Sequence, residues 1–298
     1  MSWRQFTMDL DELDPERLEE ALQSLGASAF TYSDAGDTPV LEPAPGETPL
    51  WAATRITALF DEAPDEAQLT AALCDALGRD ELPAWQIETL ADRAWEREWM
   101  RDFHAMRFGR RLWVCPTGST VEQPDAAVLN LDPGLAFGTG THATTALCLE
   151  WLDAARLEGC RVLDYGCGSG ILAIAALLLG AGHATATDID VQALTATRAN
   201  AARNAVAGRL TVLAAGRFGD GTGAGLFDVV LANILAAPLA GLAPRLAHVT
   251  RSGGDIVLSG ILRSQADEIR AAYEPWFDIA PAVAREDWIM ISGRRRED

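Results

Sequence analysis

The sequence predicts an α/β protein in two parts, a small ferredoxin-like α+β domain followed by a larger domain with a doubly wound, Rossmann-like sheet. Two observations lead to this prediction. Before about residue 92, apolar patterns of period two and period 3.6 follow one another in the order β-α-β-β-α-β. After about residue 110, strand and helix patterns alternate, as they do around a mainly parallel sheet. A chain of 298 residues is long enough for two such domains.

The N-terminal pattern begins with a half-buried strand, because Phe6 and Met8 alternate with polar residues. Asp14 then offers a helix N-cap, and Pro15 suits the first helical position. The Pro- and Gly-rich segment 38–49 could be mistaken for a domain boundary, but it is better explained as the long connection between two central strands. The other elements expected here are strands over residues 29–32 and 50–60, a helix over 66–77, and a strand around 85–87.

The next segment is predicted to connect the two domains. Residues 93–107 contain neither glycine nor proline, which favours a helix. Its apolar residues recur at steps of three and four and would lie along one stripe: Trp95, Trp99, Phe103 and Met106. Such a stripe usually packs on a neighbouring domain, although a binding site there stays open. The expected division is a domain over residues 1–92, a connecting helix over 93–109, and a second domain over 110–298.

The larger domain is expected to begin with a strand over residues 111–114 and to close with an antiparallel strand over 288–292. Parallel strands in such a sheet end at one common edge, where ligands bind. Residues that follow the strands are therefore candidates for the site. The strands expected in between are 161–163, 184–187, 210–214, 227–235 and 255–259, and the helices are 146–152, 171–179, 192–204, 239–249 and 265–273.

A glycine-rich segment, DYGCGSG from Asp164 to Gly170, joins a buried strand to a helix that is apolar all round. Its three glycines allow a tight turn and leave main-chain N–H groups open to a ligand. Asp188 follows 22 positions after Gly166, at the tip of the next strand, where a ribose diol would lie. The loop alone also fits an ordinary tight turn. Together with the two aspartates it predicts a nucleoside site.

The spacing of the glycines distinguishes between two kinds of nucleoside ligand. Dinucleotide sites carry G-x-G-x-x-G, whereas this loop reads G-x-G-x-G and has Ile171 at the sixth position. Asp164 would repel a pyrophosphate, but it suits a ligand that carries an ammonium and a sulfonium group. The sequence therefore predicts S-adenosylmethionine rather than a nicotinamide cofactor.

Two further segments lead to the same edge of the predicted sheet. Asn233 lies at the carboxyl end of a strand. The loop 131–145 contains three glycines and can fold over a ligand. Thr144 and Thr145 are expected to cap the helix that follows, whose N-terminal dipole suits the carboxylate of the methionine moiety. A threonine there is most often only a cap, and His142 is expected to be a hydrogen-bonded loop residue rather than a catalytic base.

The negative charge is concentrated in the front third of the chain. Residues 1–100 hold 22 acidic residues and 6 arginines, a balance of −16 out of −19; the other 21 acidic residues and 18 arginines leave −3. The chain has no lysine. An acidic surface attracts a basic partner and repels nucleic acid, but it also serves solubility. Both interpretations stay open on charge alone.

The composition argues against several other classes of protein. The longest apolar run is too short to span a bilayer, and the first residues lack the basic-then-apolar pattern of a signal peptide. The five cysteines show neither C-x-x-C pairing nor metal-ligand spacing with the four histidines, which indicates reduced thiols and no metal. We expect a cytoplasmic protein with no membrane and no direct nucleic-acid partner. The sequence makes no prediction of the oligomeric state.

Four segments of the chain read AFGTGTH (136–142), DYGCGSGILA (164–173), DID (188–190) and ANIL (232–235). Together they resemble the motifs of the ribosomal protein L eleven methyltransferases (PrmA), and the similarity covers essentially the whole chain. The resemblance implies a class I methyltransferase domain behind a small substrate-recognition domain. It also implies that the enzyme methylates one basic ribosomal protein of the large subunit. The implied targets are the N-terminal α-amine and lysine ε-amines of that protein, which would be trimethylated. By motif match, Thr145, Gly166, Asp188 and Asn233 would contact the methyl donor.

The chemistry of this reaction depends on alignment. Methyl transfer is an in-line displacement, so Asn233 and the adjacent main-chain carbonyls can act by orienting the attacking amine, and no general base is assigned. Alternatives are an N-methyltransferase for another basic protein or a small amine, and a donor-binding scaffold without activity. A nucleobase methyltransferase is disfavoured, because residues 234–236 offer no ring to stack a flipped base.

Overall fold

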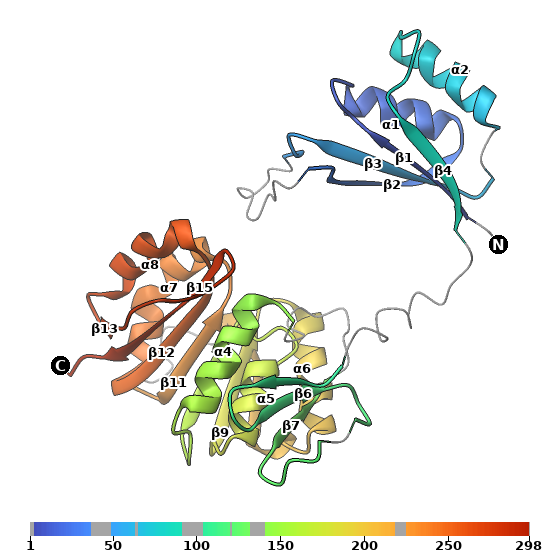
Figure 1. The fold of residues 1–298 in the computed structure, drawn as a ribbon. Helices are drawn as coiled ribbons and strands as arrows, with labels where there is room; N and C mark the ends of the chain where they lie inside the picture. Colours follow the sequence, from blue (N-terminus) through green and yellow to red (C-terminus); the bar gives the residue numbers. More distant parts are fainter. Residues whose placement is uncertain are drawn as a thin grey trace. The chain divides into compact units, whose positions relative to one another are not determined.

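The structure is a computed structural model that describes residues 3–36, 49–62, 65–90, 104–119, 121–131, 141–217 and 225–297. By their internal contacts the residues divide into two compact units, 1–99 and 100–298 (Figure 1). The predicted loop 38–49 and most of the predicted connecting helix fall outside the described residues.

The N-terminal unit has the expected element order. It consists of β1 (Trp3–Asp9), α1 (Pro15–Ser24), β2 (Ala27–Asp34), β3 (Thr54–Phe60), α2 (Glu66–Leu77) and β4 (Trp85–Leu90). The strands form an antiparallel sheet in the order β2-β3-β1-β4. This combination of element order and sheet is the ferredoxin-like arrangement.

Local signals explain where the N-terminal helices begin and where their apolar faces lie. The Asp14 carboxylate accepts a hydrogen bond from Glu16 N at 3.0 Å and so caps α1, while Asp65 caps α2 in the same way. Phe6 and Met8 of β1 are buried, whereas Thr7 between them is only partly covered. These side chains form one core with the leucines of both helices: Leu18, Leu22, Leu69 and Leu73.

The second unit opens with a small sheet that corrects one prediction. Strands β5 (Met106–Phe108), β6 (Leu112–Cys115) and β7 (Ala127–Asn130) lie in the order β5-β6-β7. The predicted helix over 93–109 is therefore wrong at its described end, because residues 106–108 pair antiparallel with 112–114. A turn with Gly109 at a φ of +72° reverses the chain between the two strands.

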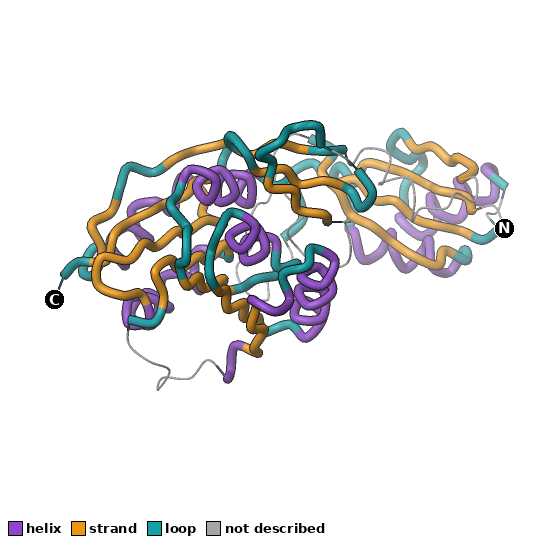
Figure 2. Tube along the Cα trace, turned by 90° about the horizontal axis from the view of Figure 1, so that it is seen from below, coloured by secondary structure: helices purple, strands orange, loops and turns teal. Residues whose placement is uncertain are grey.

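The main body of this unit alternates strands and helices as expected. Its elements are α4 (Ala143–Ala154), β8 (Arg161–Tyr165), α5 (Ile171–Leu178), β9 (His183–Asp188), α6 (Val191–Arg203), β10 (Leu210–Ala214), β11 (Phe227–Asn233), α7 (Ala236–Val249), β12 (Thr250–Leu262), α8 (Ala266–Tyr273), β13 (Phe277–Ile279), β14 (Val283–Arg285) and β15 (Trp288–Arg295), and they can be followed in Figures 1 and 2. The three- and four-residue strands β7, β13 and β14 are not predicted, because so short a segment shows no measurable period.

The large sheet is doubly wound. Its strand order is β10-β9-β8-β11-β12-β15-β13, and β14 pairs with β15. Neighbours from β10 to β12 are parallel, and β15 is antiparallel to β12, which confirms the expected antiparallel finish. Successive residues of β11 belong to different cores: Val229 and Leu231 pack with α4, α5 and α6, while Val230 and Ala232 pack with α7 and α8.

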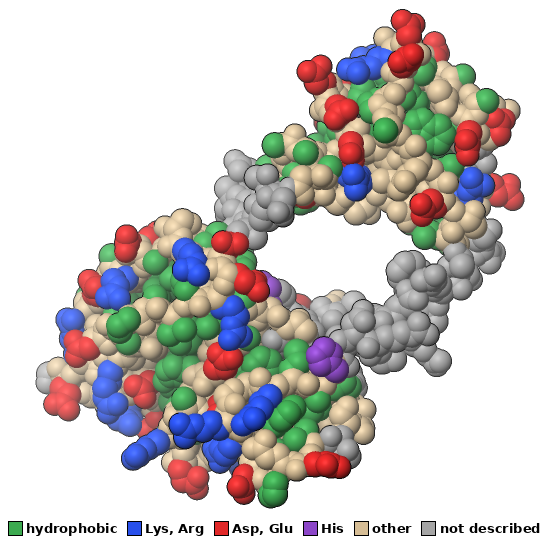
Figure 3. Space-filling view, viewed as in Figure 1, with side chains coloured by type: hydrophobic (Ala, Val, Ile, Leu, Met, Phe, Trp, Pro, Cys, Tyr) green, Lys and Arg blue, Asp and Glu red, His purple; other side chains and the backbone are tan. Residues whose placement is uncertain are grey.

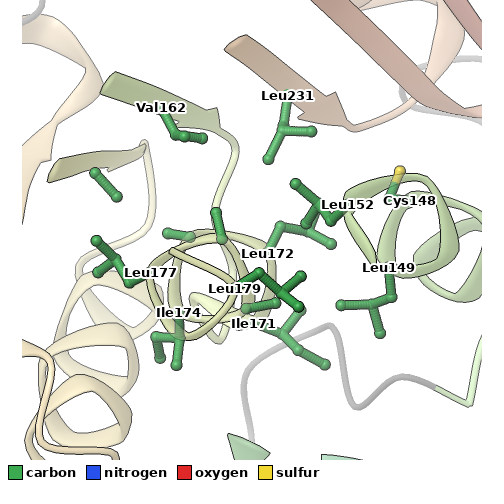
Figure 4. Packing of buried hydrophobic residues seen from close by; sticks show 14 of the residues in the cluster. Cys148, Leu149, Leu152, Val162, Ile171, Leu172, Ile174, Leu177, Leu179 and Leu231 are labelled. Atoms are coloured by element: carbon green, nitrogen blue, oxygen red, sulfur yellow. The ribbon is translucent and has the colours of Figure 1, made fainter. Parts of the chain in front are cut away.

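Helix α5 is apolar all round because it is covered on more than one side. It contacts β8 and β9 of the large sheet, β7 of the small sheet, and the helices α4 and α6. In Figure 4 the side chains of Ile171, Leu172, Ile174 and Leu177 leave the helix in different directions, and all four are buried. This packing fixes the helix that starts directly after the glycine loop.

Candidate active site

The predicted site residues converge where the strand order reverses. The chain continues from β8 to β9 and β10 on one side, and from β11 to β12 on the other. In open α/β sheets, ligands bind outside the carboxyl ends of the strands at this point. Gly166 follows β8 directly and Asn233 ends β11, and their preceding residues, Tyr165 and Ala232, are register partners. Asp188 ends the adjacent strand β9.

The glycine loop is held in shape by helix α6. Thr197 Oγ1 donates a hydrogen bond to the carbonyl of Gly168 at 2.9 Å, and Asn200 Nδ2 donates to that of Ser169 at 2.9 Å. A Cβ on Gly170, whose φ is +79°, would lie 2.7 Å from Cγ2 of Thr197. The third glycine is thus required by its own backbone and by the approach of α6. The protein itself sets the conformation of the loop.

Asp188 carries a carboxylate that two main-chain groups hold in place. Its Oδ2 accepts from Gly168 N at 2.9 Å, and its Oδ1 accepts from Asp190 N at 3.0 Å. Each oxygen can accept a further hydrogen bond, so the pair suits a ligand with two neighbouring hydroxyl groups. The next side chain, Ile189, is 90% exposed. An apolar side chain this exposed beside a fixed carboxylate suits a ligand with a flat apolar part.

The Asn233 side chain is oriented by a residue far away in sequence. Its Nδ2 donates a hydrogen bond to Oγ1 of Thr145 at 3.2 Å, and Thr145 is fully buried on α4. The NH₂ group of the amide is therefore engaged, and Oδ1 remains as an acceptor for a ligand. Thr145 and Asn233, which the sequence places in separate segments, come together in the structure.

Asp164 lies beneath the loop rather than on its open side. The residue is 1% exposed, and its Oδ2 accepts from Ala173 N at 3.0 Å. Burial raises the pKa of this carboxyl to about 7; the bond from Ala173 opposes the shift and the charge of Asp188 adds to it. Because its side chain is covered, Asp164 cannot touch a cationic ligand. It acts on such a ligand only through the electrostatic attraction of its ionised form.

The start of α4 corrects a second prediction. Thr144 and Thr145 do not cap this helix, because it already begins at Ala143 and both lie in its first turn. The N-cap is His142, whose Nδ1 accepts from Thr144 N at 3.3 Å. The expectation that His142 is a hydrogen-bonded residue is confirmed. The glycines of the predicted loop fall within residues 132–140, outside the described part of the chain.

Several residues of this region were missed by the sequence analysis. Thr197 and Asn200 could have been noticed as polar residues three apart on one helix, facing the loop. Ile189 stands between two acidic residues, which is an unusual place for an exposed apolar side chain. Trp288, which the sequence places only at the start of the closing strand, has its ring edge-on to that of His142 with centroids 5.0 Å apart.

The sheet order, the glycine loop after β8 and the carboxylate at the end of β9 define the class of this protein. It is a Rossmann-like methyltransferase that uses S-adenosylmethionine. The particular family follows from comparison with known proteins. The family model described as "Ribosomal protein L11 methyltransferase (PrmA)" matches residues 2–296, and the chain belongs to this family.

Relatives of the chain share nearly its whole length. A "Ribosomal protein L11 methyltransferase" of Methylococcus capsulatus is 54% identical over 295 residues, which is 99% of each chain. One of Pseudomonas aeruginosa is 52% identical over 299 residues and is covered completely. The crystal structure of a ribosomal protein L11 methylase from Lactobacillus delbrueckii subsp. bulgaricus superimposes with a TM-score of 0.60 at 35% identity, over 65% of this chain and 100% of that one. Within the described residues, no helix has the length and apolar character needed to cross a membrane.

Proposed function

We propose that this protein transfers methyl groups from S-adenosylmethionine to amino groups of ribosomal protein L11. The observation that supports this most is that Gly166, Asp188 and Asn233 converge where the strand order of the sheet reverses. The relatives of the chain are named ribosomal protein L11 methyltransferases. The expected targets are the N-terminal α-amine and lysine ε-amines, each methylated up to three times. A ribosomal substrate also places the reaction in the cytoplasm.

The residues present fit the methyl donor. Gly166, Gly168 and Gly170 all have positive φ, so the main chain turns where a side chain would otherwise stand. We infer that the Asp188 carboxylate accepts hydrogen bonds from both ribose hydroxyls of the methyl donor, and that the Ile189 side chain packs on its adenine. Thr145 stays a predicted contact of the methyl donor, but its hydroxyl oxygen already accepts a hydrogen bond from Asn233. When bound, S-adenosylmethionine supplies a methyl group on a positively charged sulfur.

Asn233 is proposed to orient the attacking amine. An amine attacks only when it is neutral, which at pH 7 costs roughly 4–5 kcal/mol for a lysine and roughly 1–1.5 kcal/mol for an α-amine. The Oδ1 of Asn233 can accept a hydrogen bond from that nitrogen and hold its lone pair toward the methyl group. Because alignment is the main requirement of an in-line displacement, an amide that is fixed by Thr145 is sufficient for this role.

The acidic N-terminal region is proposed to recognise the substrate. Residues 1–92 are assigned to recognition, 93–109 to the connection and 110–298 to catalysis. Acidic side chains dominate the drawn face of the N-terminal unit in Figure 3, whereas arginines are more numerous on the second unit. A basic protein of the large ribosomal subunit is the partner that such a surface attracts. Raising the salt concentration should therefore slow methylation at subsaturating substrate.

The test is methylation with a labelled donor. The protein is incubated with labelled S-adenosylmethionine and either purified unmethylated ribosomal protein L11 or a ribosomal extract, and modified residues are mapped by mass spectrometry. We expect label on the α-amine and on lysines of that protein in both samples. Label on another basic protein or a small amine would instead support the alternative substrate classes. Donor binding without any transfer would indicate a scaffold.

A further inference from the structure

The residue after Asn233, Ile234, lies between two glycines, one directly after β8 and one within β12. A Cβ on Gly166, which follows β8, would lie 2.3 Å from Cγ2 of Ile234. A Cβ on Gly260 of β12 would lie 2.2 Å from the carbonyl oxygen of Ile234 and 2.7 Å from its carbonyl carbon. Neither distance is possible for real atoms, since packed carbon and oxygen atoms stay more than about 3 Å apart. Ile234 keeps its position only because both neighbours are glycine.

The two contacts differ in kind. Gly166 makes room for the side chain of Ile234, which could adopt another rotamer. Gly260 makes room for the main chain of Ile234, which cannot move without its neighbours. The atoms that meet Gly260 belong to the residue directly after Asn233. The carbonyl group of Ile234 lies in the peptide to Leu235, and its N, which would be 3.2 Å from the Cβ, lies in the peptide to Asn233. A displacement of Ile234 is therefore passed to the Asn233 backbone.

The strand around Gly260 is shaped for this contact. Gly260 is buried and has a φ of +81°, and the register between β12 and β15 shifts between Leu258 and Ile261. A bulge of this kind re-aims one strand at the point where it occurs. On the other side of β12, Ser259 remains the register partner of Asn233. The irregularity therefore lies beside the end of β11.

We propose that Gly260 is a positioning residue for methyl transfer, which fixes the Ile234 peptide and thereby the direction of the Asn233 amide. This inference rests on the proposed role of Asn233. The amide then has two anchors: Thr145 holds its NH₂ group, and Gly260 holds the main chain that carries it. A misplacement of about 1 Å lowers a rate by up to about a hundredfold even when the chemistry is untouched.

The test compares two glycines of the same strand. Gly253 also lies in β12 and has a φ of +66°, but a Cβ there would meet nothing closer than 3.7 Å. Gly260→Ala and Gly253→Ala both place an alanine at a positive φ, and only the first displaces Ile234. We expect kcat to fall about tenfold to a hundredfold in Gly260→Ala, with donor affinity changed by less than about threefold, and Gly253→Ala to keep its kcat. Equal kcat values for the two variants would overturn the proposal.

A second pair keeps the test usable if Gly260→Ala does not fold. Asparagine tolerates positive φ better than alanine, so Gly260→Asn and Gly253→Asn relieve the strain and retain the difference in contact. We again expect kcat to fall in the Gly260 variant only, and equal kcat values for this pair would overturn the proposal. A loss of donor affinity as large as the loss of kcat in the folded Gly260 variants would indicate a general structural role and would also overturn the proposal.

A double variant shows whether Gly260 acts through Asn233. In the Asn233→Ala background, Gly260→Ala should lower kcat by less than about twofold further, because the oriented amide is already missing. Independent, multiplying losses would contradict the inference. If Asn233→Ala alone retains the full kcat, the proposed role of Asn233 fails instead, so the two failures can be told apart.

Discussion

The two edges of the large sheet hold their charged groups in different ways. At the amino edge, three described carboxylates each meet an arginine: Asp228 with Arg251 at 2.5 Å, Asp278 with Arg296 at 2.8 Å, and Asp255 with Arg294 at 3.8 Å. At the carboxyl edge, Asp188 is held by two main-chain N–H groups.

This difference shows what separates a structural carboxylate from one available to a ligand. An arginine neutralises the charge of its partner, whereas a main-chain N–H fixes the oxygen and leaves most of the charge in place. Asp228 illustrates the first case. Burial opposes its ionisation, but the bond from Arg161 N and the bond and charge of Arg251 outweigh burial and hold its pKa below the usual value. The sequence alone does not show which acidic residues pair with an arginine and which are held by main-chain N–H groups, because most of these partners are distant along the chain.

The largest expected effect at the carboxyl edge comes from Asn233. Asn233→Ala removes the acceptor that orients the amine, so kcat at saturating substrate should fall about a hundredfold, or about 3 kcal/mol in the barrier. Steady-state methylation assays with ribosomal protein L11 measure this kcat. The variant also frees the Thr145 hydroxyl, so Thr145→Val serves as the control for the lost contact. An unchanged kcat would reduce Asn233 to a structural strand end.

Asp164 should make stability depend on pH. Its pKa is raised from 3.8 to about 7, so between these values the folded state binds more protons than the unfolded state. The free energy of unfolding should therefore fall as pH rises from 5 to 8, by about 2–3 kcal/mol from this group. Urea denaturation of the wild type and Asp164→Asn isolates the contribution. Parallel curves for the two proteins would contradict the raised pKa.

Asp188 and Asp228 provide a direct comparison of the two edges. Asp188→Ala should weaken binding of S-adenosylmethionine about tenfold to a hundredfold, or about 1.5–3 kcal/mol, by removing the acceptors for the ribose. Asp228→Ala should leave donor affinity unchanged and lower stability instead. Calorimetric titration of both variants measures the affinities. Asp190 is unsuited as the control, because it caps α6 by accepting from Gln192 N at 2.8 Å. Equal losses of affinity would break the distinction between the edges.

The smallest effect is expected for the exposed ion pairs. Arg251 is 44% exposed and Asp228 is 23% exposed, so their attraction is screened by water. Arg251→Gln should lower the free energy of unfolding by less than about 1 kcal/mol and leave methylation unchanged. Thermal unfolding at low and high salt measures the stability. A slower methyl transfer in this variant would show that the amino edge takes part in function.

The predictions from sequence succeeded where the signal is local. The turn at Gly166, the strand that ends in Asp188 and the strand that ends in Asn233 are each readable within a few residues, because glycine, period and strand ends are properties of short segments. The Thr145–Asn233 hydrogen bond was not predicted, since it joins residues 88 positions apart. The strand at Met106–Phe108 was read as helix because pairing with β6, rather than its own composition, determines it.

One carboxylate ties the small sheet to the rest of the second unit. Asp153, in the last turn of α4, accepts hydrogen bonds from the main-chain N–H groups of Arg110, Arg111 and Leu112. Arg110 and Arg111 directly precede β6, Leu112 begins it, and all three lie outside the large sheet. In hydrogen–deuterium exchange they should be protected together and lose protection together, at the rate at which α4 opens. Amide exchange at the first residues of β6 would then depend on the opening of a helix more than 40 residues downstream.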